Sequence, residues 1–230
     1  YFGRMNYSFK DKYLAEVNVR ADGTSRLASG LRWGVFPSFS AGWRFTKEKF
    51  MDGISWLTNG KLRASWGVLG NQNISTYPYQ ALLSYAGVYP FDNSSLSQGV
   101  SQVALNNAKI KWETTKTSDI GIDLSLFNDL SISFDVYKKY TSDILRAAQV
   151  TGVVGVSAPA VNSGAMQNTG FDLDLQYRKG IKSGALRGFT LGGGLVVSSF
   201  KNKLVKFGVP QDNGSSIYKE GSPWNAFYLL

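Results

Sequence analysis

The sequence predicts an all-β fold of antiparallel strands. Three observations support this prediction: apolar and polar residues alternate with a period of two in many segments, helical periodicity is weak throughout, and turn residues separate the alternating segments. The 230 residues are enough for one large all-β domain. No apolar run approaches the roughly 18 residues of a membrane-spanning helix, so any membrane crossing would have to use strands.

The first half of the chain contains four alternating segments. In the second of them, Val17 and Val19 fall on one face, and Glu16 and Arg20 fall on the other. The turn Lys10–Lys12 separates this segment from the one before it. The four predicted strands are Tyr1–Phe9, Tyr13–Asp22, Trp33–Phe45 and Lys61–Gly70.

The second half contains four more strands. Asn128 and Asp129 form the turn between the first two. The four predicted strands are Thr117–Leu126, Leu130–Val136, Phe171–Arg178 and the glycine-rich run "FTLGGGLVVSSF", Phe189–Phe200. The sequence therefore predicts about eight strands in total, each close to the roughly ten residues that a tilted strand needs to cross a bilayer.

Connection lengths alternate along the chain. The short connections are Lys10–Lys12, Asn128–Asp129 and Lys179–Gly188, and the long ones are Asn71–Lys116, Tyr140–Asn168 and Lys201–Pro223. Two connections blur the pattern, because the one after Asp22 is of moderate length and Thr46–Asn59 is longer than a tight turn. Short turns on one side and long loops on the other are typical of outer-membrane barrels.

The two faces of the strands favour a membrane barrel over a soluble β-sandwich, although the sandwich stays open. Aromatic residues lie on the apolar face near the short connections, as an interfacial girdle would; they are Phe9, Tyr13, Trp43, Phe45 and Tyr177. The polar faces mix Gly, Ser, Asn, Asp and Arg, as expected of a barrel interior. We therefore expect the apolar rows to face lipid.

Composition excludes most enzyme chemistry. The chain has no Cys and no His, so it contains no thiol nucleophile, imidazole base or Cys/His zinc site. Asp172 and Asp174 share a face, but nothing marks either as a catalytic acid. The net charge of +9 comes from scattered Lys and Arg, so we expect no nucleic-acid partner. We also expect no catalytic residues, no metal site and no cofactor.

Several long stretches resemble the barrel of the SusC/RagA family of TonB-dependent outer-membrane transporters. The resemblance begins with "YFGRMNYSFKDKYLAEVNVRADGTSRLASGLRWGVFPSFSAGWRF" and "LRASWGVLGNQNISTYPY". It continues in the same order with "IKWETTKTSDIGIDLSLFNDLSISFDVYKKYTSDIL", "NSGAMQNTGFDLDLQY" and "FKNKLV". The resemblance implies a cell outer-membrane barrel of about 22 strands with a plugged lumen. It also implies import of glycans or peptides, energised by TonB, under a SusD-like surface lipoprotein that acts as a lid.

The same resemblance predicts the domain organisation. We expect residues 1–230 to be an internal segment of one barrel domain, a partial antiparallel transmembrane β-barrel of about eight strands. The plug domain, through which TonB would act, and the final barrel strands would lie outside this sequence. An isolated set of eight strands would leave two open edges, and hydrocarbon does not tolerate unpaired backbone groups.

Two sets of residues are candidates for function. The first contains loop aromatics that could contact cargo or the lid: Tyr77, Tyr79, Tyr85, Tyr89, Phe91 and Trp112. The second contains charged residues of the lumen wall that could contact the plug, pair across strands or simply be solvated: Glu16, Arg20, Arg44, Arg63, Asp119, Asp123, Asp135, Asp172 and Asp174. The alternative function is a binding or adhesion module without an energised plug, built as a soluble sandwich or a passive barrel.

Overall fold

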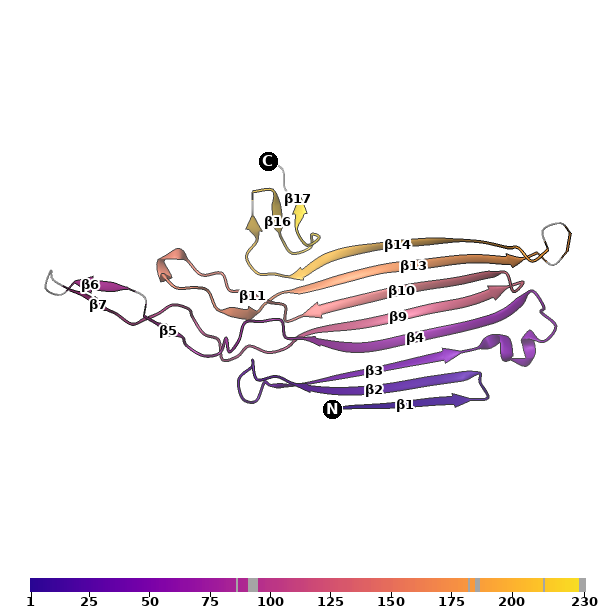
Figure 1. Ribbon diagram of the computed structural model, residues 1–230, viewed down its shortest axis with the longest axis horizontal. Helices are drawn as coiled ribbons and strands as arrows, with labels where there is room; N and C mark the ends of the chain where they lie inside the picture. The colour runs from indigo at the N-terminus through magenta and orange to yellow at the C-terminus, as the bar shows by residue number, and fades with distance from the viewer. Residues whose placement is uncertain (86, 91–94, 182, 185–186, 213, 228–230) are drawn as a thin grey trace.

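The computed structural model describes residues 1–85, 87–90, 95–181, 183–184, 187–212 and 214–227. Their main feature is one curved antiparallel sheet of eight long strands, with connections at both ends (Figure 1). The strands are β1 (Phe2–Phe9), β2 (Tyr13–Gly23), β3 (Trp33–Trp43), β4 (Leu57–Asn71), β9 (Glu113–Leu126), β10 (Leu130–Ser142), β13 (Ala165–Gly180) and β14 (Thr190–Lys206). They lie side by side in chain order. The eight predicted strands are therefore confirmed.

Strand ends differ from the predicted ones for identifiable reasons. β3 ends at Trp43, because Phe45 already belongs to the 3₁₀ turn η1 (Phe45–Lys47), which is followed by η2 (Lys49–Met51). β10 continues six residues past the predicted end at Val136. Its last part, "YKKYTS", is polar on both faces, so the period-two pattern disappears although the ladder to β13 continues to Ser142.

The register places apolar residues on one face of the whole sheet. Ala41 of β3 pairs with Ala64 of β4, which pairs with Ile120 of β9, which pairs with Val136 of β10. This face is uncovered: Phe39 is 53% exposed and Ile120 is 66% exposed. Among the described residues no second sheet packs on it, as a β-sandwich would require. We call this apolar side the outer face and the polar side the inner face.

Buried residues gather where the long connections meet the sheet. Leu27, Phe36, Ile110 and Trp112 form one cluster, with Leu145 packed against it. A second cluster joins the rings of Phe207, Tyr218 and Trp224: the Phe207 and Tyr218 rings stack with centroids 5.5 Å apart, and the Tyr218 and Trp224 rings meet edge to face at 5.0 Å. Phe207 is buried, whereas Trp224 is 42% exposed. Hydrophobic packing therefore organises the long loops, whereas the sheet is held by its backbone ladders.

The long loops carry short strands of their own. An arm leaves the sheet between β4 and β9 and extends far beyond it (Figure 1). It contains the ladders β5 (Leu83–Ser84) with β8 (Ser101–Gln102), and β6 (Val88–Pro90) with β7 (Leu96–Gln98). The other short elements are β11 (Leu145–Ala147), η3 (Gly152–Val154), β12 (Ala160–Asn162), β15 (Gln211–Asp212), β16 (Ser216–Tyr218) and β17 (Ala226–Phe227). Within the described ranges, no helix has the length and hydropathy that a membrane-crossing helix needs.

The first cluster gives a test of this loop packing. Ile110 is completely buried, so Ile110→Ala should lower the free energy of local opening of the loop bases by about 2 to 4 kcal/mol through the cavity that it leaves. Hydrogen exchange measured by mass spectrometry should show faster exchange around residues 27–36 and 105–112, with the eight long strands unchanged. Val153→Ala is the matched control, because Val153 is almost fully exposed. Equal protection in both variants would contradict the packing.

Candidate functional site

Arg63 of β4 is the centre of an ion-pair network on the inner face. Its Nε donates to both carboxylate oxygens of Asp123 at 3.2 and 3.1 Å, and its Nη2 donates to Asp135 Oδ2 at 2.6 Å. Nη2 also donates to Ser133 Oγ at 3.2 Å, and Nη1 lies 3.6 Å from Asp119 Oδ1. One guanidinium thus connects β4, β9 and β10 through side chains as well as through the backbone ladder.

Gly121 makes this geometry possible. It lies between Asp119 and Asp123 on the inner face of β9, directly under the guanidinium of Arg63. A Cβ at this position would lie 2.3 Å from Asp135 Oδ1 and 2.8 Å from Arg63 Cζ. A side chain at this position would require the Asp135 carboxylate and the Arg63 guanidinium to shift, so the glycine leaves open the space that both groups occupy.

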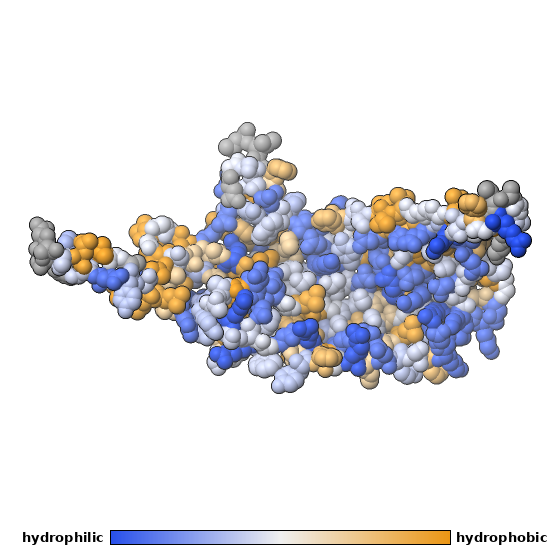
Figure 2. All heavy atoms as spheres, viewed as in Figure 1, coloured by the Kyte–Doolittle hydropathy of each residue, from blue (hydrophilic) through white to orange (hydrophobic). Residues whose placement is uncertain are grey.

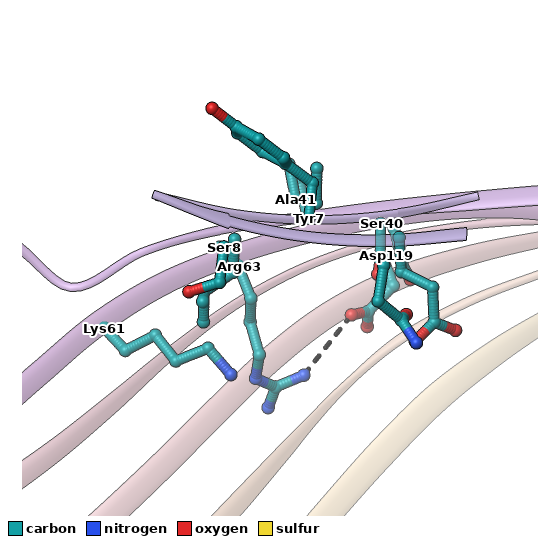
Figure 3. A pocket seen from close by; sticks show the side chains of 14 residues that line it. Tyr7, Ser8, Ser40, Ala41, Lys61, Arg63 and Asp119 are labelled. Carbon is teal, nitrogen blue, oxygen red and sulfur yellow. Dashed lines mark ion pairs between the residues drawn. The ribbon is translucent and has the colours of Figure 1, made fainter. Parts of the chain in front are cut away.

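The inner face is hollowed beside this network. A hollow of about 520 Å³ is lined from β1, β2, β3, β4 and β9, and includes Ser8, Ser40, Lys61 and Arg63. Figure 3 shows Lys61 and Arg63 pointing to one side of the sheet while Tyr7 points to the other, as the alternation predicts. The wall of the hollow combines polar and apolar side chains and carries both signs of charge.

The remaining predicted wall residues lie on the same face but pair locally. Glu16 Oε1 accepts from Asn18 Nδ2 at 2.7 Å and lies 3.8 Å from Arg4, and Arg20 pairs with Asp22 at 2.7 Å. On β13, Asp172 faces Asp135 directly across the ladder, and Asp174 faces Ser133. Asp135 Oδ1 and Asp174 Oδ1 are both buried and have no hydrogen-bond partner.

Arg44 lies apart from the other wall residues. It follows β3 at the rim of the sheet, where Asp11 of the first turn accepts from both Arg44 and Lys47. These partners hold the pKa of Asp11 below its ordinary value, the hydrogen bond from Lys47 having the largest effect. The position fits a rim contact between two connections better than a lumen contact.

Glu48 is the centre of a second rim contact. Its carboxylate accepts from the Tyr13 hydroxyl at 2.7 Å, from Lys12 Nζ at 3.0 Å and from the Trp43 indole Nε1 at 3.2 Å. These donors, the Tyr13 hydroxyl first, lower the pKa of Glu48 to about 2. Strand alternation does not point to Asp11 or Glu48, because both residues lie in connections. The sequence features that mark these two connections are the charged runs "KDK" and "RFTKEK".

The predicted loop aromatics separate into two environments. Tyr77 and Tyr79 meet edge to face at the root of the arm, with ring centroids 6.2 Å apart. Farther out, Tyr85 is 74% exposed and Tyr89 is 65% exposed. Phe91 lies outside the described residues.

Trp112 is a core residue rather than a surface one. It is buried in the first cluster, meets Phe36 edge to face at 5.4 Å, and donates from Nε1 to the carbonyl of Arg32 at 3.2 Å. These contacts give it a structural role, because its ring is not available to a ligand in this conformation.

Adjacent residues of β11 connect the two loop clusters. Leu145 packs against the first cluster. Arg146 stacks on the Phe207 ring of the second, 4.1 Å from its centroid, and donates to the Phe207 carbonyl at 2.6 Å and to the Ser163 carbonyl at 3.0 Å. Three long loops are therefore joined into one platform, a role for Arg146 that no sequence pattern indicated.

Comparison with known proteins places this geometry in context. Residues 1–226 match the family model described as "TonB dependent receptor-like, beta-barrel". The chain is 33% identical over 223 residues to "TonB-dependent receptor P3" of Formosa agariphila, covering 96% of this chain and 21% of that protein. It is also 33% identical over 184 residues to "TonB-dependent receptor SusC" of Bacteroides thetaiotaomicron, covering 77% of this chain and 18% of that protein.

Solved structures agree with the sequence matches. The RagAB peptide importer in its closed-closed state superposes with a TM-score of 0.85 at 27% identity, covering 98% of this chain and 24% of that one. Its open-open state gives a TM-score of 0.82 at 26% identity, covering 96% and 24%. The chain thus spans about a fifth to a quarter of the length of these relatives.

The Glu48 contact predicts a pH dependence at the rim. A carboxyl whose pKa falls from 4.5 to about 2 on folding contributes stability that is complete above about pH 4.5 and is lost as the pH falls toward 2. Between these values, indole fluorescence and hydrogen exchange in residues 43–56 should report loosening of the connection. Glu48→Gln should abolish this dependence, and Asp52→Asn, an exposed neighbour, should leave it intact. The same titration in the Gln variant would show that another group is responsible.

Proposed function

The chain belongs to the TonB-dependent receptor-like β-barrel family, and on that basis we propose that it forms part of the barrel wall of a TonB-dependent importer in the cell outer membrane. The observation that carries the proposal is the eight-stranded sheet with an exposed apolar outer face and a polar, charged inner face. In water such an outer face would be an aggregation hazard, whereas in a bilayer it is the surface that lipid requires.

The domain organisation follows from the share of the relatives that the chain covers. Because it matches about a fifth of TonB-dependent receptor P3 and of SusC, we propose that residues 1–230 are one segment of a larger barrel domain. Other strands of the same protein would pair with β1 and β14, since backbone groups must all be bonded inside hydrocarbon. A plug domain in another part of the same polypeptide would fill the lumen and receive the force from TonB.

The inner wall supports a contact with that plug. The network around Arg63 and the acids of β13 together carry more negative than positive charge, and two of their buried carboxylate oxygens lack a donor. Basic or hydroxyl side chains of a plug would satisfy these oxygens. We assign these residues to positioning and not to catalysis; the relatives bear the names of receptors and importers.

The arm supports a contact outside the barrel. From Gln72 to Ala108 the only charged residue of the sequence is Asp92, and the arm is rich in Tyr, Ser and Asn. Low charge with exposed tyrosine is typical of protein-binding surfaces. The proposed occupant is the SusD-like surface lipoprotein that closes over the barrel, with an oligopeptide or oligosaccharide as the cargo beneath it.

One experiment tests the function as a whole. The native polypeptide that contains this stretch is purified in mild detergent from the outer membrane, and its intact mass and co-purifying chains are determined. A mass several times 25.2 kDa, with a bound surface lipoprotein, is the expected result. A native chain near 25.2 kDa that is freely soluble and alone would overturn the proposal and support a non-energised binding module.

The face assignment predicts the effect of a charge in the lipid. Val19→Arg should destabilise the assembled barrel by about 2 to 4 kcal/mol if the side chain lies near the bilayer midplane. Urea titration of the full-length protein in vesicles measures this difference. Ser40→Arg is the matched control, because Ser40 lines the polar hollow on the inner face. Equal assembly of both variants would contradict the assignment of faces.

The arm predicts a loss of binding without a loss of folding. Replacing both Tyr85 and Tyr89 with Ala should weaken the affinity of the full-length transporter for its lipoprotein by roughly tenfold or more, as for exposed aromatic anchors of an interface. Calorimetry with the two purified proteins measures the affinity. The double Tyr→Phe variant keeps both rings and separates the role of the rings from that of the hydroxyls. Unchanged affinity of the Ala variant would remove these residues from the interface.

A further inference from the structure

The rim that carries the short connections pairs aromatic rings with cations. We define the short-connection rim as residues 9–13, 43–56, 127–129, 177–181 and 187–189 of the described chain. In it, aromatic residues repeatedly lie within two sequence positions of a Lys or Arg; examples are Phe9 with Lys10, Phe50 with Lys49, Tyr177 with Lys179, and Phe189 with Arg187. The ammonium of Lys10 lies over the Phe9 ring, 5.3 Å from its centroid.

The connection between β3 and β4 lies against the outer face of this rim. Phe45 crosses the sheet over Gly60, where an added Cβ would be 2.4 Å from Phe45 Cζ. Thr46 Oγ1 accepts from the Gly60 amide at 3.0 Å and donates to the Gly60 carbonyl at 3.3 Å. Trp43 contacts Phe45 and Phe50, with ring centroids 5.9 and 6.4 Å apart. The connection is thus fixed where the outer face meets the water.

Aromatic side chains of the rim are exposed on this side. Phe50 is 66% exposed and Phe127 is 65% exposed. Phe127 also packs against Trp56, with ring centroids 6.5 Å apart. Trp56 is itself 50% exposed, and an amphipathic indole at this depth belongs at the headgroup level of a bilayer.

Of the four acids of the rim, Asp11 and Glu48 are held in internal contacts, Asp129 lies near Lys179, and Asp52 is exposed. Asp11 is held by Arg44 and Lys47, and Glu48 by Lys12, Tyr13 and Trp43. Lys10 and Lys49, by contrast, form no ion pair among the described residues. Lys179 lies 3.9 Å from Asp129 and is more than half exposed, so that pair is weak. The rim therefore presents cations that point to an external anion.

We propose that the short-connection rim binds the anionic headgroups of phospholipids in the leaflet that it faces. The inference rests on the proposed function, because it requires the sheet to cross a membrane. Each lysine near an anionic surface adds favourable electrostatic energy, and the adjacent ring inserts beside the headgroup. The rim thereby fixes the height of the barrel in the bilayer at this end.

The opposite end of the sheet also places Lys next to aromatic residues in the sequence, as in Lys111–Trp112 and Lys206–Phe207, but there Trp112 and Phe207 are buried in the loop clusters. There, Arg26 and Arg32 donate to the carbonyls of Ile74 and Leu27. Arg146 stacks on Phe207 inside a loop cluster. These three arginines bond within the loops, so they are less available to an external anion than Lys10 and Lys49 of the short-connection rim.

The test uses the full-length protein in nanodiscs made of equal amounts of phosphatidylglycerol and phosphatidylethanolamine. Native mass spectrometry counts the lipid molecules of each kind that stay bound to the protein after it is released from the nanodisc. The wild-type protein should retain phosphatidylglycerol in excess. The triple variant K10Q/K49Q/K179Q should lower that excess by about a hundredfold, since each of the three lysines contributes roughly a fivefold preference and the factors multiply.

Two control variants make the result specific. K109Q/K206Q/K219Q removes the same charge from the long-loop end and should keep the wild-type excess. K10R/K49R/K179R preserves the rim charge and should keep it too. Equal retention of the two lipids by the wild-type protein, or an equal loss in the rim variant and the long-loop control, would overturn the proposal.

Folding is measured separately by the shifted electrophoretic mobility of an unheated barrel. If the triple Gln variant does not fold, K49Q alone replaces it, because Lys49 is exposed and its side chain makes no hydrogen bond or ion pair in the described chain. K49Q should lower the excess by roughly fivefold, and an unchanged excess would refute the role of the rim. A wild-type protein that never inserts into the bilayer would refute the proposed function instead, so the two failures are distinguishable.

Discussion

Complete backbone hydrogen bonding between neighbouring strands is the constraint on which this structure depends. The outer face has no protein cover among the described residues, so apolar packing cannot hold the sheet together as it holds a soluble core. The ladders that join β1 to β14 in chain order supply that cohesion instead. They also explain why the strands are so long: β13 and β14 keep their pairing over nearly their full length, with one irregularity near Ala165. Figure 2 shows how hydrophobic and hydrophilic residues are distributed over one side of the molecule.

Once the ladders are in place, the two faces are free to differ. The outer face needs only apolar side chains of any shape, whereas the inner face can carry charge if each charge finds a partner. Arg63 satisfies this condition for three strands at once, and Gly121 provides the space that the guanidinium occupies. The charges of Asp172 and Asp174 are less well compensated, which is consistent with a surface that a further part of the protein covers.

The sequence predicted the sheet well because period-two alternation acts within single strands. Val17 and Glu16 identify their faces without any knowledge of their neighbours. The functional details were harder, because they depend on residues far apart in the chain. The sequence suggests Trp112 as a ligand-contacting loop aromatic, whereas in the structure it packs with Phe36 and Ile110 in the first cluster. The contacts of Arg146 with Phe207 cross 61 residues and follow no periodic pattern. Arg44 was assigned to the inner face by alternation, which fails one residue after a strand ends.

The position of Leu145 and Arg146 has a consequence for how loop length can vary among relatives of this chain. Both loop clusters include a side chain from the same three-residue strand, so an insertion at the base of any one loop would shift the packing of the others. The outer part of the arm has no such connection among its described residues, where β5 pairs with β8 and β6 pairs with β7. Substitutions and length changes are therefore tolerated at its tip and penalised at its root. A lineage could exchange the tip and acquire a different partner while it inherits the wall unchanged.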